Sequence, residues 1–317
     1  MRKSKLTICF ITYGRFTDRY LPAFLASLKN QTFQDFSILV MDNTETEDNE
    51  NKKFIKENYP EIDFEWAGSN LGFSRAYNKL IAKSLQAGAE YFLMLNPDMI
   101  LEPNAVEEML KVLESRGDLG SVSPKVLSWD FENNEKTNFI DTCGILLKSG
   151  LRFIDAGQGL VDDGSFDSVD ILGPSGAAGL FRLQALEKIK KNDQYFDQAM
   201  FMYKEDCDLA YRLFLAGFKS VCAGQAVVYH DRTARARGQG DVQVALNRKN
   251  KSRLVKEWSF TNQHIIFLKY WRLQDWRNRL AILFFACKMF VFVLFFERYL
   301  LKCYKEAWRK STGFSKK

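Results

Sequence analysis

The sequence predicts an α/β fold built on a mostly parallel, doubly wound sheet, and three observations support this prediction. Runs of apolar, β-favouring residues occur repeatedly in the first hundred residues. Segments with helical spacing alternate with these runs, as in parallel sheets. Polar side chains follow three of the runs directly. Because ligands of such sheets bind beyond the carboxyl ends of the strands, we expect the functional site there.

The predicted elements follow one another in a regular order. The strand-like runs of the first hundred residues are 6–13, 37–43, 62–68 and 91–96. The helical segments between them are 19–31, 50–59 and 74–87. Residues 119–175 are mixed and strand-rich, with glycine-rich connections. A helix at about 205–216 and a strand at 219–230 complete this part of the chain.

Size and charge predict a division of the chain. Its 317 residues, 46% of them hydrophobic, suffice for one large domain or two small ones. Residues 1–231 hold 25 Lys and Arg against 34 Asp and Glu, a net charge of −9, whereas residues 232–317 hold 20 against 5, a net charge of +15. We therefore predict a domain over 1–231 and a basic helical region over 232–317. Such a region suits a polyanion, an anionic membrane or a phosphorylated ligand.

An apolar segment at about 280–296 stands out in the basic region. It holds 17 residues, and Lys288 is its one charged side chain. As a helix it would span about 25 Å, short of the roughly 30 Å hydrocarbon core of a membrane. Aromatic and cationic residues flank it, which favours a helix lying in the membrane interface. A buried helix, an oligomer contact and a true membrane span stay open as alternatives.

The cysteines and the N-terminus bear on the cellular compartment. Six cysteines are scattered without CxxC spacing, so we expect reduced thiols in a cytosolic setting rather than a disulfide framework or a zinc site. The opening MRKSKLTICFITY begins like a signal peptide, but polar residues interrupt its apolar run and no small-residue cleavage site follows. We expect a first strand there instead.

The stretch LMLNPDMI illustrates the polar strand ends. Asn96, Pro97 and Asp98 follow an apolar run, and all three are turn formers, so a simple turn is one interpretation. Two earlier runs also end in polar residues, at 12–13 and 42–43. A turn alone does not require a carboxylate at successive strand ends, which favours a functional site.

Seven short motifs occur along the chain in a defined order. They are ITYGR (11–15), VMDN (40–43), SNLGFSRAYN (69–78), LNPD (95–98), GPSGAAGLFR (173–182), FDQAMFMYKEDCDLAYRLFLAGF (196–218) and VVYHD (227–231). With these motifs the chain resembles glycosyltransferase family 2 over roughly residues 6–232, and within it the bacterial, membrane-associated, rhamnosyltransferase-like branch. The resemblance implies a GT-A-type fold and the inverting transfer of a sugar from a nucleotide-sugar donor.

The resemblance also implies which residues meet the donor. A nucleotide sugar offers a base, a ribose and a diphosphate, and a carboxylate at a strand end can accept from a base N–H or from ribose hydroxyls. The residues expected to bind the donor are Thr12, Tyr13, Asp42, Asn70, Gly72, Arg75, Asn78 and Asn96. For Asn70 and Gly72, a turn that starts a helix is the alternative.

The resemblance makes Asp98 the metal carboxylate, with His230 as a second contact to the metal or to phosphate. A divalent ion would stabilise the negative charge that grows on the diphosphate as the glycosidic bond breaks. Hard oxygen ligands favour Mg²⁺ or Mn²⁺. Family members often have Asp-x-Asp where this chain has Asn96-Pro97-Asp98, so we expect a weaker metal site. A structural role is the alternative for His230.

Asp206 is the expected general base, and Glu205 is expected to support the acceptor side. The inverting mechanism needs one carboxylate to take the proton of the acceptor hydroxyl while that oxygen attacks the anomeric carbon. Acidic residues in a first helical turn also complement the helix dipole, so a purely structural role is the alternative. The QxxRW motif of processive synthases is absent, which predicts the transfer of a single sugar.

The basic region is then expected to hold the enzyme on the cytoplasmic face of the cell membrane, as a peripheral or monotopic protein. The expected acceptor is a polyprenyl-diphosphate-linked or polysaccharide intermediate of cell-surface glycan synthesis, and dTDP-rhamnose is the first candidate donor by resemblance. The basic loop DRTARARGQG (231–240) would close over the diphosphate, meet the acceptor, or remain a solvated loop. We expect no nucleic-acid partner, because no nucleic-acid-binding module is recognised.

Two other functions stay open. A nucleotidyltransferase should carry a glycine-rich, basic phosphate loop near the N-terminus, and ITYGRFTDRY lacks one. A non-catalytic, membrane-bound scaffold of the same fold would bind the donor without turning it over.

Overall fold

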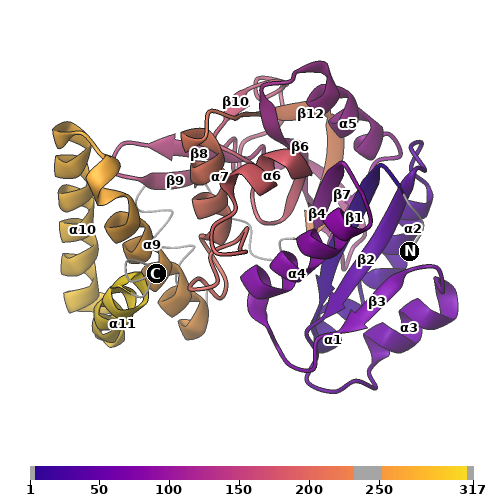
Figure 1. The fold of residues 1–317 in the computed structure, drawn as a ribbon, viewed down its shortest axis with the longest axis horizontal. Coiled ribbons are helices and arrows are strands. Elements are labelled where there is room, and N and C mark those ends of the chain that lie inside the picture. Colours follow the sequence, from indigo (N-terminus) through magenta and orange to yellow (C-terminus); the bar gives the residue numbers. More distant parts are fainter. Residues whose placement is uncertain (1–3, 232–251, 313–317) are drawn as a thin grey trace.

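The computed structural model describes residues 4–231 and 252–312, and Figure 1 shows the course of the chain. The described strands are β1 (Leu6–Thr12), β2 (Phe36–Asp42), β3 (Asp63–Trp66), β4 (Tyr91–Leu95), β5 (Met99–Leu101), β6 (Leu119–Asp130), β7 (Glu135–Thr142), β8 (Ile145–Lys148), β9 (Arg152–Asp155), β10 (Asp170–Ile171), β11 (Ala178–Arg182) and β12 (Lys219–Asp231). The described α-helices are α1 (Gly14–Asp18), α2 (Leu21–Lys29), α3 (Glu50–Asn58), α4 (Gly72–Gln86), α5 (Ala105–Ser115), α6 (Leu183–Ile189), α7 (Glu205–Leu215), α9 (Arg253–Tyr270), α10 (Trp276–Phe296) and α11 (Leu301–Thr312). Apart from Asp231, the basic loop predicted at 231–240 lies outside the described residues.

The central sheet has the strand order β10-β12-β6-β11-β4-β1-β2-β3. β4, β1, β2 and β3 run parallel to one another, and β12 runs parallel to β6. β11 lies antiparallel between β4 and β6, and β5, β7 and β10 add further antiparallel pairs. The predicted alternation of strand and helix in the first hundred residues is confirmed. β7 and β10 belong to the segment for which the sequence predicts a mixed, strand-rich structure.

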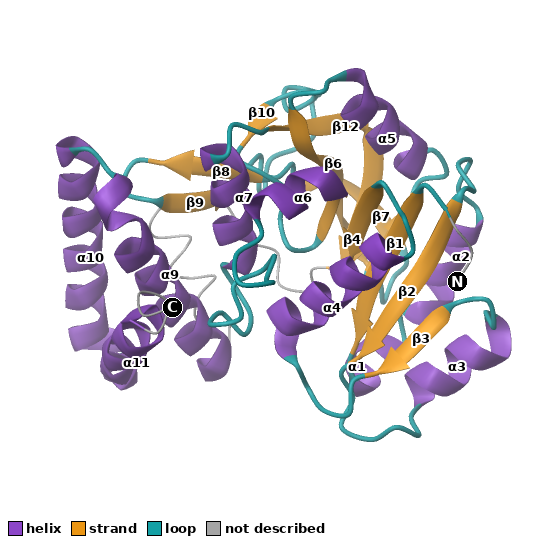
Figure 2. Cartoon of the chain, viewed as in Figure 1, coloured by secondary structure: helices purple, strands orange, loops and turns teal. Residues whose placement is uncertain are grey.

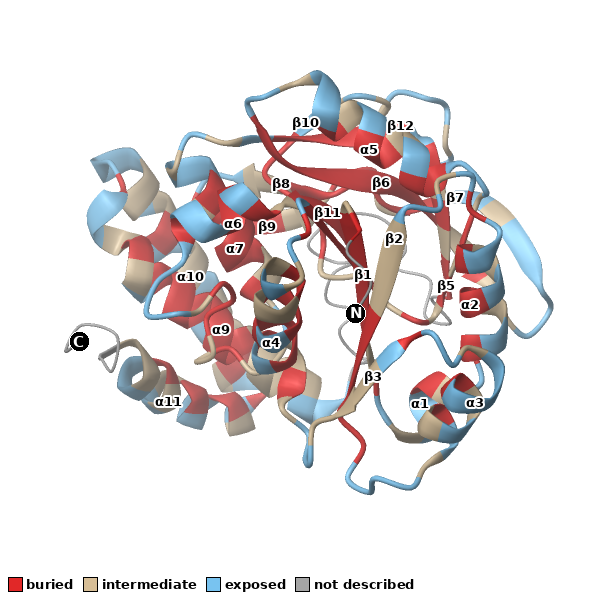
Figure 3. Ribbon diagram, turned by 45° about the vertical axis from the view of Figure 1, so that its right-hand side comes forward, coloured by how far each residue is buried: buried red, intermediate tan, exposed pale blue. Residues whose placement is uncertain are grey.

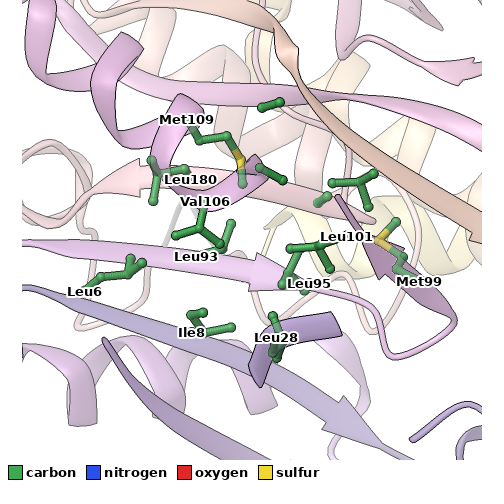
Figure 4. Close-up of a cluster of buried hydrophobic side chains, with 14 of the residues drawn as sticks. Leu6, Ile8, Leu28, Leu93, Leu95, Met99, Leu101, Val106, Met109 and Leu180 are labelled. Atoms are coloured by element: carbon green, nitrogen blue, oxygen red, sulfur yellow. The ribbon is translucent and has the colours of Figure 1, made fainter. Parts of the chain in front are cut away.

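Helices cover both faces of this sheet (Figure 2). One hydrophobic cluster joins strand residues to α2, α3 and α5, and a second joins them to α4, α6 and α7. Because successive strand residues point to opposite faces, Ile8 belongs to the first cluster and its neighbour Cys9 to the second. Figure 4 shows part of the first cluster, in which Ile8 and Leu93 lie near Leu28 of α2 and Met109 of α5. Most strand residues are buried, and the exposed residues gather on the outer helix faces (Figure 3).

The C-terminal helices α9, α10 and α11 lie to one side of the central sheet, beside the β8-β9 hairpin (Figure 1). A third hydrophobic cluster joins Phe153 of this hairpin and Tyr211 of α7 to Ile266 of α9 and Ile282 of α10. Since α7 also packs toward the central sheet through Leu209, it lies between the sheet and the C-terminal helices. The predicted helical character of the C-terminal region is thereby confirmed, and the domain boundary after residue 231 stays a prediction.

Helix α10 begins four residues before the segment predicted from the sequence. Its 21 residues span about 32 Å at the usual helical rise, and by length and composition it could cross a membrane. Its buried residues are Ile282 and Val293. Its large exposed apolar residues are Trp276, Leu280, Leu283, Phe284, Phe290, Val291, Phe295 and Phe296. The helix is therefore not buried within the described chain, which leaves an interfacial helix, a membrane span and an oligomer contact.

Candidate active site

The ends of β1 and β2 are joined by a hydrogen-bond network around Asp42. The hydroxyls of Thr12 and Thr44 donate to Asp42 Oδ1 at 2.8 and 2.6 Å, and Asn49 Nδ2 donates to Asp42 Oδ2 at 2.8 Å. Both Thr12 and Asp42 are fully buried. Asp42 therefore holds the 43–49 loop against the end of β1. The predicted contact of Thr12 and Asp42 with a nucleoside stays a prediction.

Some of the residues predicted to bind the donor are accessible, among them Tyr13, Arg75 and Asn96. Tyr13 follows β1 directly, is 40% exposed, and donates its hydroxyl hydrogen to Glu45 Oε1 at 2.8 Å. Arg75 on α4 is exposed, and Asn96 after β4 is half-buried. The Asn96 side chain is held beyond the strand end because its backbone N–H donates to the Ala177 carbonyl at 2.8 Å. Asn70 is exposed as well, so of the residues predicted to bind the donor these four present surface to a ligand.

Asn70 and Gly72 form the turn at which α4 begins. The Gly72 N–H donates to Asn70 Oδ1 at 2.9 Å. Gly72 has a φ of +71°, and a Cβ atom there would lie 2.5 Å from the Phe201 ring, so this position needs glycine for both reasons. The next residue, Phe73, donates its N–H to the Phe201 carbonyl at 2.9 Å. These are the contacts of a helix-initiating turn, and a contact with the donor stays a prediction.

Asn78 is buried on α4 and holds the segment that leads to α7. Its Oδ1 accepts from the N–H groups of Tyr195 and Phe196 at 3.0 and 2.7 Å, and its Nδ2 donates to the Phe196 carbonyl at 2.8 Å. Ser74, one helical turn earlier, donates to the carbonyl of Met200. Ser74 is not among the predicted site residues, although its spacing of four residues from Asn78 places both on one helix face. Asn78 is thus a positioning residue in this structure, and its predicted donor contact stays a prediction.

Strand β12 places His230 between Asp98 and Asp141. His230 Nε2 lies 3.3 Å from Asp98 Oδ2, and its Nδ1–H donates to Asp141 Oδ2 at 2.8 Å. Burial lowers the pKa of His230, but the charge of Asp98 and the hydrogen bond to Asp141 outweigh burial and raise the pKa to about 10. The Asp231 N–H donates to the Asp98 carbonyl at 3.0 Å, which ties the end of β12 to the LNPD segment. The two predicted metal contacts therefore lie together. Asp141 was missed because no motif marks β7.

Asp98 and His230 fit a divalent cation as a partial set of ligands. Asp98 Oδ1 is buried and has no hydrogen-bond partner among the described residues. Carboxylate oxygen is a ligand that Mg²⁺ and Mn²⁺ prefer. Imidazole nitrogen also binds transition metals, and at His230 the cation would have to displace the proton that Nε2 shares with Asp98. Within residues 4–231 and 252–312, no group of three or more His, Cys, Asp and Glu side chains has the arrangement of a metal site. Other positions would be left for diphosphate oxygens and water, as is usual for Mg²⁺ at phosphate sites.

Helix α7 begins with Glu205 and Asp206, whose surroundings differ. Glu205 is buried, and its Oε2 has no partner among the described residues. Burial and the charge of Asp206 raise the pKa of Glu205 well above its usual range. Asp206 is half-buried, and its two oxygens accept from the N–H groups of Gly176 and Cys207 at 2.8 and 2.7 Å. Of the two, Asp206 is better placed to accept a proton from a ligand.

The turn before α7 is held by the C-terminal region. Tyr203 and Lys204 have φ values of +69° and +70°, a left-handed conformation that costs roughly 1 kcal/mol or more for each residue. Asn262 of α9 donates from Nδ2 to the carbonyls of Met202 and Tyr203 at 2.9 and 2.7 Å. The sequence gives no prediction of this contact, since nothing in the α9 sequence indicates which loop Asn262 reaches.

The fold and these polar groups define the class of protein. A mixed α/β sheet carries Asn96 and Asp98 just after β4 and His230 near the end of β12, and the first turn of α7 places Asp206 against the glycine-rich 173–182 segment. The sheet is that of a GT-A-type fold. Residues 7–153 match the model of Glycosyl transferase family 2. The chain is a glycosyltransferase that carries a family 2 domain, which confirms the resemblance seen in the sequence.

Curated relatives and solved structures agree with this classification. Two N-acetylglucosaminyl-diphospho-decaprenol L-rhamnosyltransferases, from two strains of Mycobacterium tuberculosis, are each 25% identical to this chain over 246 residues, covering 72% of this chain and 76% of the relative. The crystal structure of GalNAc-T7 with UDP, GalNAc and Mn²⁺ has a TM-score of 0.58 and 10% sequence identity, covering 85% of this chain and 48% of that one. This chain therefore spans about half of the GalNAc-T7 structure, and the likeness shows a shared fold.

Proposed function

We propose that this enzyme is an inverting, metal-dependent glycosyltransferase that adds a single sugar to a polyprenyl-diphosphate-linked acceptor in cell-surface glycan synthesis. The mycobacterial relatives are named for L-rhamnosyl transfer to an N-acetylglucosaminyl-diphospho-decaprenol. Their name supports L-rhamnose, carried by a dTDP donor, as the first candidate sugar. It also favours a lipid diphosphate over a free polysaccharide as the acceptor.

The observation that carries the proposal is that two carboxylates, Asp206 and Asp98, have different surroundings. Asp206 is oriented by the N–H groups of Gly176 and Cys207 and stays partly exposed. Asp98 lies beside His230 and keeps one buried oxygen without a partner among the described residues. The first site suits proton transfer and the second suits a cation bound to diphosphate.

In the proposed reaction Asp206 accepts the proton of the acceptor hydroxyl as the hydroxyl oxygen attacks the anomeric carbon. A bond forms between that oxygen and the anomeric carbon. The bond from the anomeric carbon to the donor oxygen breaks, and its electron pair leaves on the nucleoside diphosphate. Asp98 and His230 would hold Mg²⁺ or Mn²⁺, which when bound neutralises the charge on the diphosphate. Glu205, buried at the same helix start, would support the acceptor side.

Attachment to the cytoplasmic face of the cell membrane completes the proposal. The exposed apolar face of α10 and the net charge of +15 in residues 232–317 support contact with an anionic membrane surface. A lipid-linked acceptor is confined to the same surface, so attachment would bring enzyme and acceptor together.

The test measures donor binding and sugar transfer separately. Detergent-solubilised protein would be heated with UDP-, dTDP- and GDP-sugars, with and without Mg²⁺ or Mn²⁺. Donor at 100 times its Kd should add about 2.7 kcal/mol of apparent stability, and we expect this shift for one nucleotide class in the presence of metal. Transfer would be followed on N-acetylglucosamine linked through diphosphate to a short isoprenyl chain. Donor binding without transfer to any acceptor would favour the scaffold, and pyrophosphate release from a sugar phosphate and a nucleotide would favour a nucleotidyltransferase.

Substitutions then test the two carboxyl sites. Asp206→Asn should lower turnover by about 10²- to 10⁴-fold while leaving the donor-induced thermal shift in place. Asp98→Ala should abolish the response to metal. The matched control is Asp193→Asn, since the Asp193 side chain is 97% exposed and lies outside the site. Near-normal turnover of Asp206→Asn would exclude it as the general base, and an unchanged metal response of Asp98→Ala would exclude it as a metal ligand.

A further inference from the structure

The described C-terminal helices α9, α10 and α11 line an open cavity of about 530 Å³. Its walls include His264 and Leu268 of α9, Leu283 and Ala286 of α10, and Tyr304 and Trp308 of α11. This volume falls within the range of small-molecule binding sites. None of these residues belongs to the candidate active site, so the cavity is a separate feature of the molecule.

The cavity wall is apolar apart from a few groups, and two of those groups have no partner. His264 donates its Nδ1–H to the Phe260 carbonyl at 2.8 Å, and burial lowers the pKa of His264, so the ring is neutral. His264 Nε2 and the Tyr304 hydroxyl are buried without a hydrogen-bond partner among the described residues. Lys305 at the exposed edge is the one charged side chain of the described lining, and deeper in the cavity a charged headgroup would be buried without a partner, which is costly. The cavity therefore suits an uncharged, largely hydrocarbon ligand.

The cavity opens on a surface suited to a membrane. Leu283 and Trp308 line it and are 54% and 63% exposed, so they form its mouth. Lys305 also lines the cavity and is exposed, and the surrounding C-terminal region is strongly basic. An anionic bilayer complements this charge, while aromatic and aliphatic side chains enter its apolar layer. A hydrocarbon chain could thus pass from the bilayer into the cavity without crossing water.

Helix α9 connects this cavity to the active site. His264 and Leu268 form part of the cavity wall, while Asn262 on the same helix holds the carbonyls of Met202 and Tyr203 just before α7. One helix is therefore both a wall of the cavity and a support for the turn that presents the proposed base. A lipid bound in the cavity lies next to the element that organises the catalytic loop.

We propose that this cavity binds the isoprenoid chain of the lipid-linked acceptor, at the part of the chain next to the diphosphate. The inference rests on the proposed function, which supplies the acceptor class. Bulk phospholipid needs only to touch the outer face of α10. The acceptor lipid, in contrast, has to be brought to Asp206, and a cavity that shares α9 with the catalytic loop would hold it there.

Direct binding tests the proposal without using activity. The probe is geranylgeraniol, an isoprenoid alcohol, added to the detergent-solubilised full chain and followed by native mass spectrometry and by the fluorescence of the tryptophans at the cavity. Ala286→Phe fills the cavity and should weaken binding by roughly tenfold or more. Leu283→Trp narrows the mouth and should act in the same direction; because Leu283 is largely exposed, this variant keeps the fold if Ala286→Phe does not. The matched control is Val291→Phe, an exposed position on α10 outside the cavity lining, which should bind as the parent does.

A second pair of measurements identifies the ligand chemistry. Tyr304→Phe removes a hydroxyl that a hydrocarbon leaves unpaired, so it should bind geranylgeraniol at least as tightly as the parent. Hexadecanol, a saturated chain, should bind more weakly than the isoprenoid. Loss of binding in Tyr304→Phe would overturn the hydrocarbon assignment, and equal binding of hexadecanol would overturn the isoprenoid assignment. A dimer that buries α10 and excludes the probe would overturn the cavity as a lipid site.

Kinetics separate failure of this inference from failure of the proposed function. If both hold, Ala286→Phe should raise the KM for acceptors that carry an isoprenoid chain and leave the KM unchanged for an acceptor whose diphosphate carries a methyl group in place of the chain. Transfer with no effect of chain length in parent or variant would overturn the cavity proposal and leave the function standing. Specific binding of the probe without transfer to any acceptor would overturn the function and leave the lipid site.

Discussion

Lys269 of α9 and Asp208 of α7 form a buried ion pair, with 2.6 Å between Nζ and Oδ1. Asp208 lies two residues after Asp206, so this pair ties the C-terminal region to the helix that presents the proposed base. Tyr270 donates its hydroxyl hydrogen to the same oxygen at 2.7 Å, and Arg212 donates to Asp208 Oδ2 at 2.9 Å. The basic region therefore has a structural role in the active site as well as its expected role at the membrane.

Replacing Lys269 should destabilise the protein more than replacing a surface lysine. Lys269→Met leaves Asp208 and Asp197 buried without the cation they share, and breaking a buried pair in this manner costs about 3 kcal/mol or more. The control is Lys302→Met, which removes an exposed contact with Glu257 and should cost at most about 1 kcal/mol. Urea unfolding of both variants provides the comparison, and equal losses would mean that the buried pair adds nothing to stability.

The same carboxylate should make stability depend on acid. Burial raises the pKa of Asp208, but Lys269 and Arg212 outweigh burial and lower it to about 2, from an ordinary value of 3.8. Because the folded-state pKa is depressed, the stabilisation is fully present above about pH 4 and is lost as the pH falls toward 2. Asp197 acts in the opposite sense, because burial raises its pKa. We expect the free energy of unfolding to fall by about 2 kcal/mol across this window. The urea midpoint should fall less steeply below about pH 4 for Asp208→Asn than for the parent. Equal slopes would contradict the assignment.

The sequence predicts the sheet well and the loop contacts poorly, for a physical reason. The strand pattern follows from a local rule, alternation of apolar runs with helical segments, and it places Asp98 directly after a strand. The link between Asp98 and His230 came from the family resemblance. Asn78 shows the limit of such rules. Its place in a motif suggested a ligand contact, whereas its side chain holds Tyr195 and Phe196, more than 100 residues away in sequence. Asn262 was missed for the same reason, because partners this distant depend on tertiary packing.

Asn262 should affect turnover more than it affects donor binding. In Asn262→Ala the left-handed turn at Tyr203 and Lys204 loses both of its hydrogen bonds from α9, which should displace Asp206. Small displacements of reacting groups are costly, so we expect kcat to fall by roughly 10- to 100-fold with the KM for the donor little changed. The matched control is Gln263→Ala, which removes a buried hydrogen bond from α9 to the Leu151 carbonyl and should lose stability without losing kcat. Equal losses of kcat in both variants would show that kcat depends on the docking of α9 as a whole and not on the hydrogen bonds of Asn262.

Two glycines with similar backbone conformation provide another controlled comparison. Gly72 and Gly68 have φ values of +71° and +79°, but an added Cβ meets Phe201 only at position 72 and nothing within 4 Å at position 68. Gly68→Ala should therefore cost about 1 to 2 kcal/mol from backbone strain alone. Gly72→Ala should cost more and weaken donor binding, because the contact between α4 and the 201 segment must shift. The free energy of unfolding and the Kd for the donor are the measurements, and equal effects would exclude a specific role of the Phe201 contact.

Asp141 should control how well His230 binds a metal. The carboxylate accepts from His230 Nδ1–H, which fixes the ring so that Nε2 points toward Asp98. Such outer partners orient a ligand and raise its basicity, and their loss typically lowers metal affinity by about 10- to 100-fold. We therefore expect weaker Mn²⁺ binding by Asp141→Asn in calorimetry, with the exposed Asp35→Asn as control. If Asp141→Asn bound Mn²⁺ like the parent while Asp98→Ala did not, Asp98 would hold the ion without His230, and the Asp141–His230 pair would serve only to join β7 to β12.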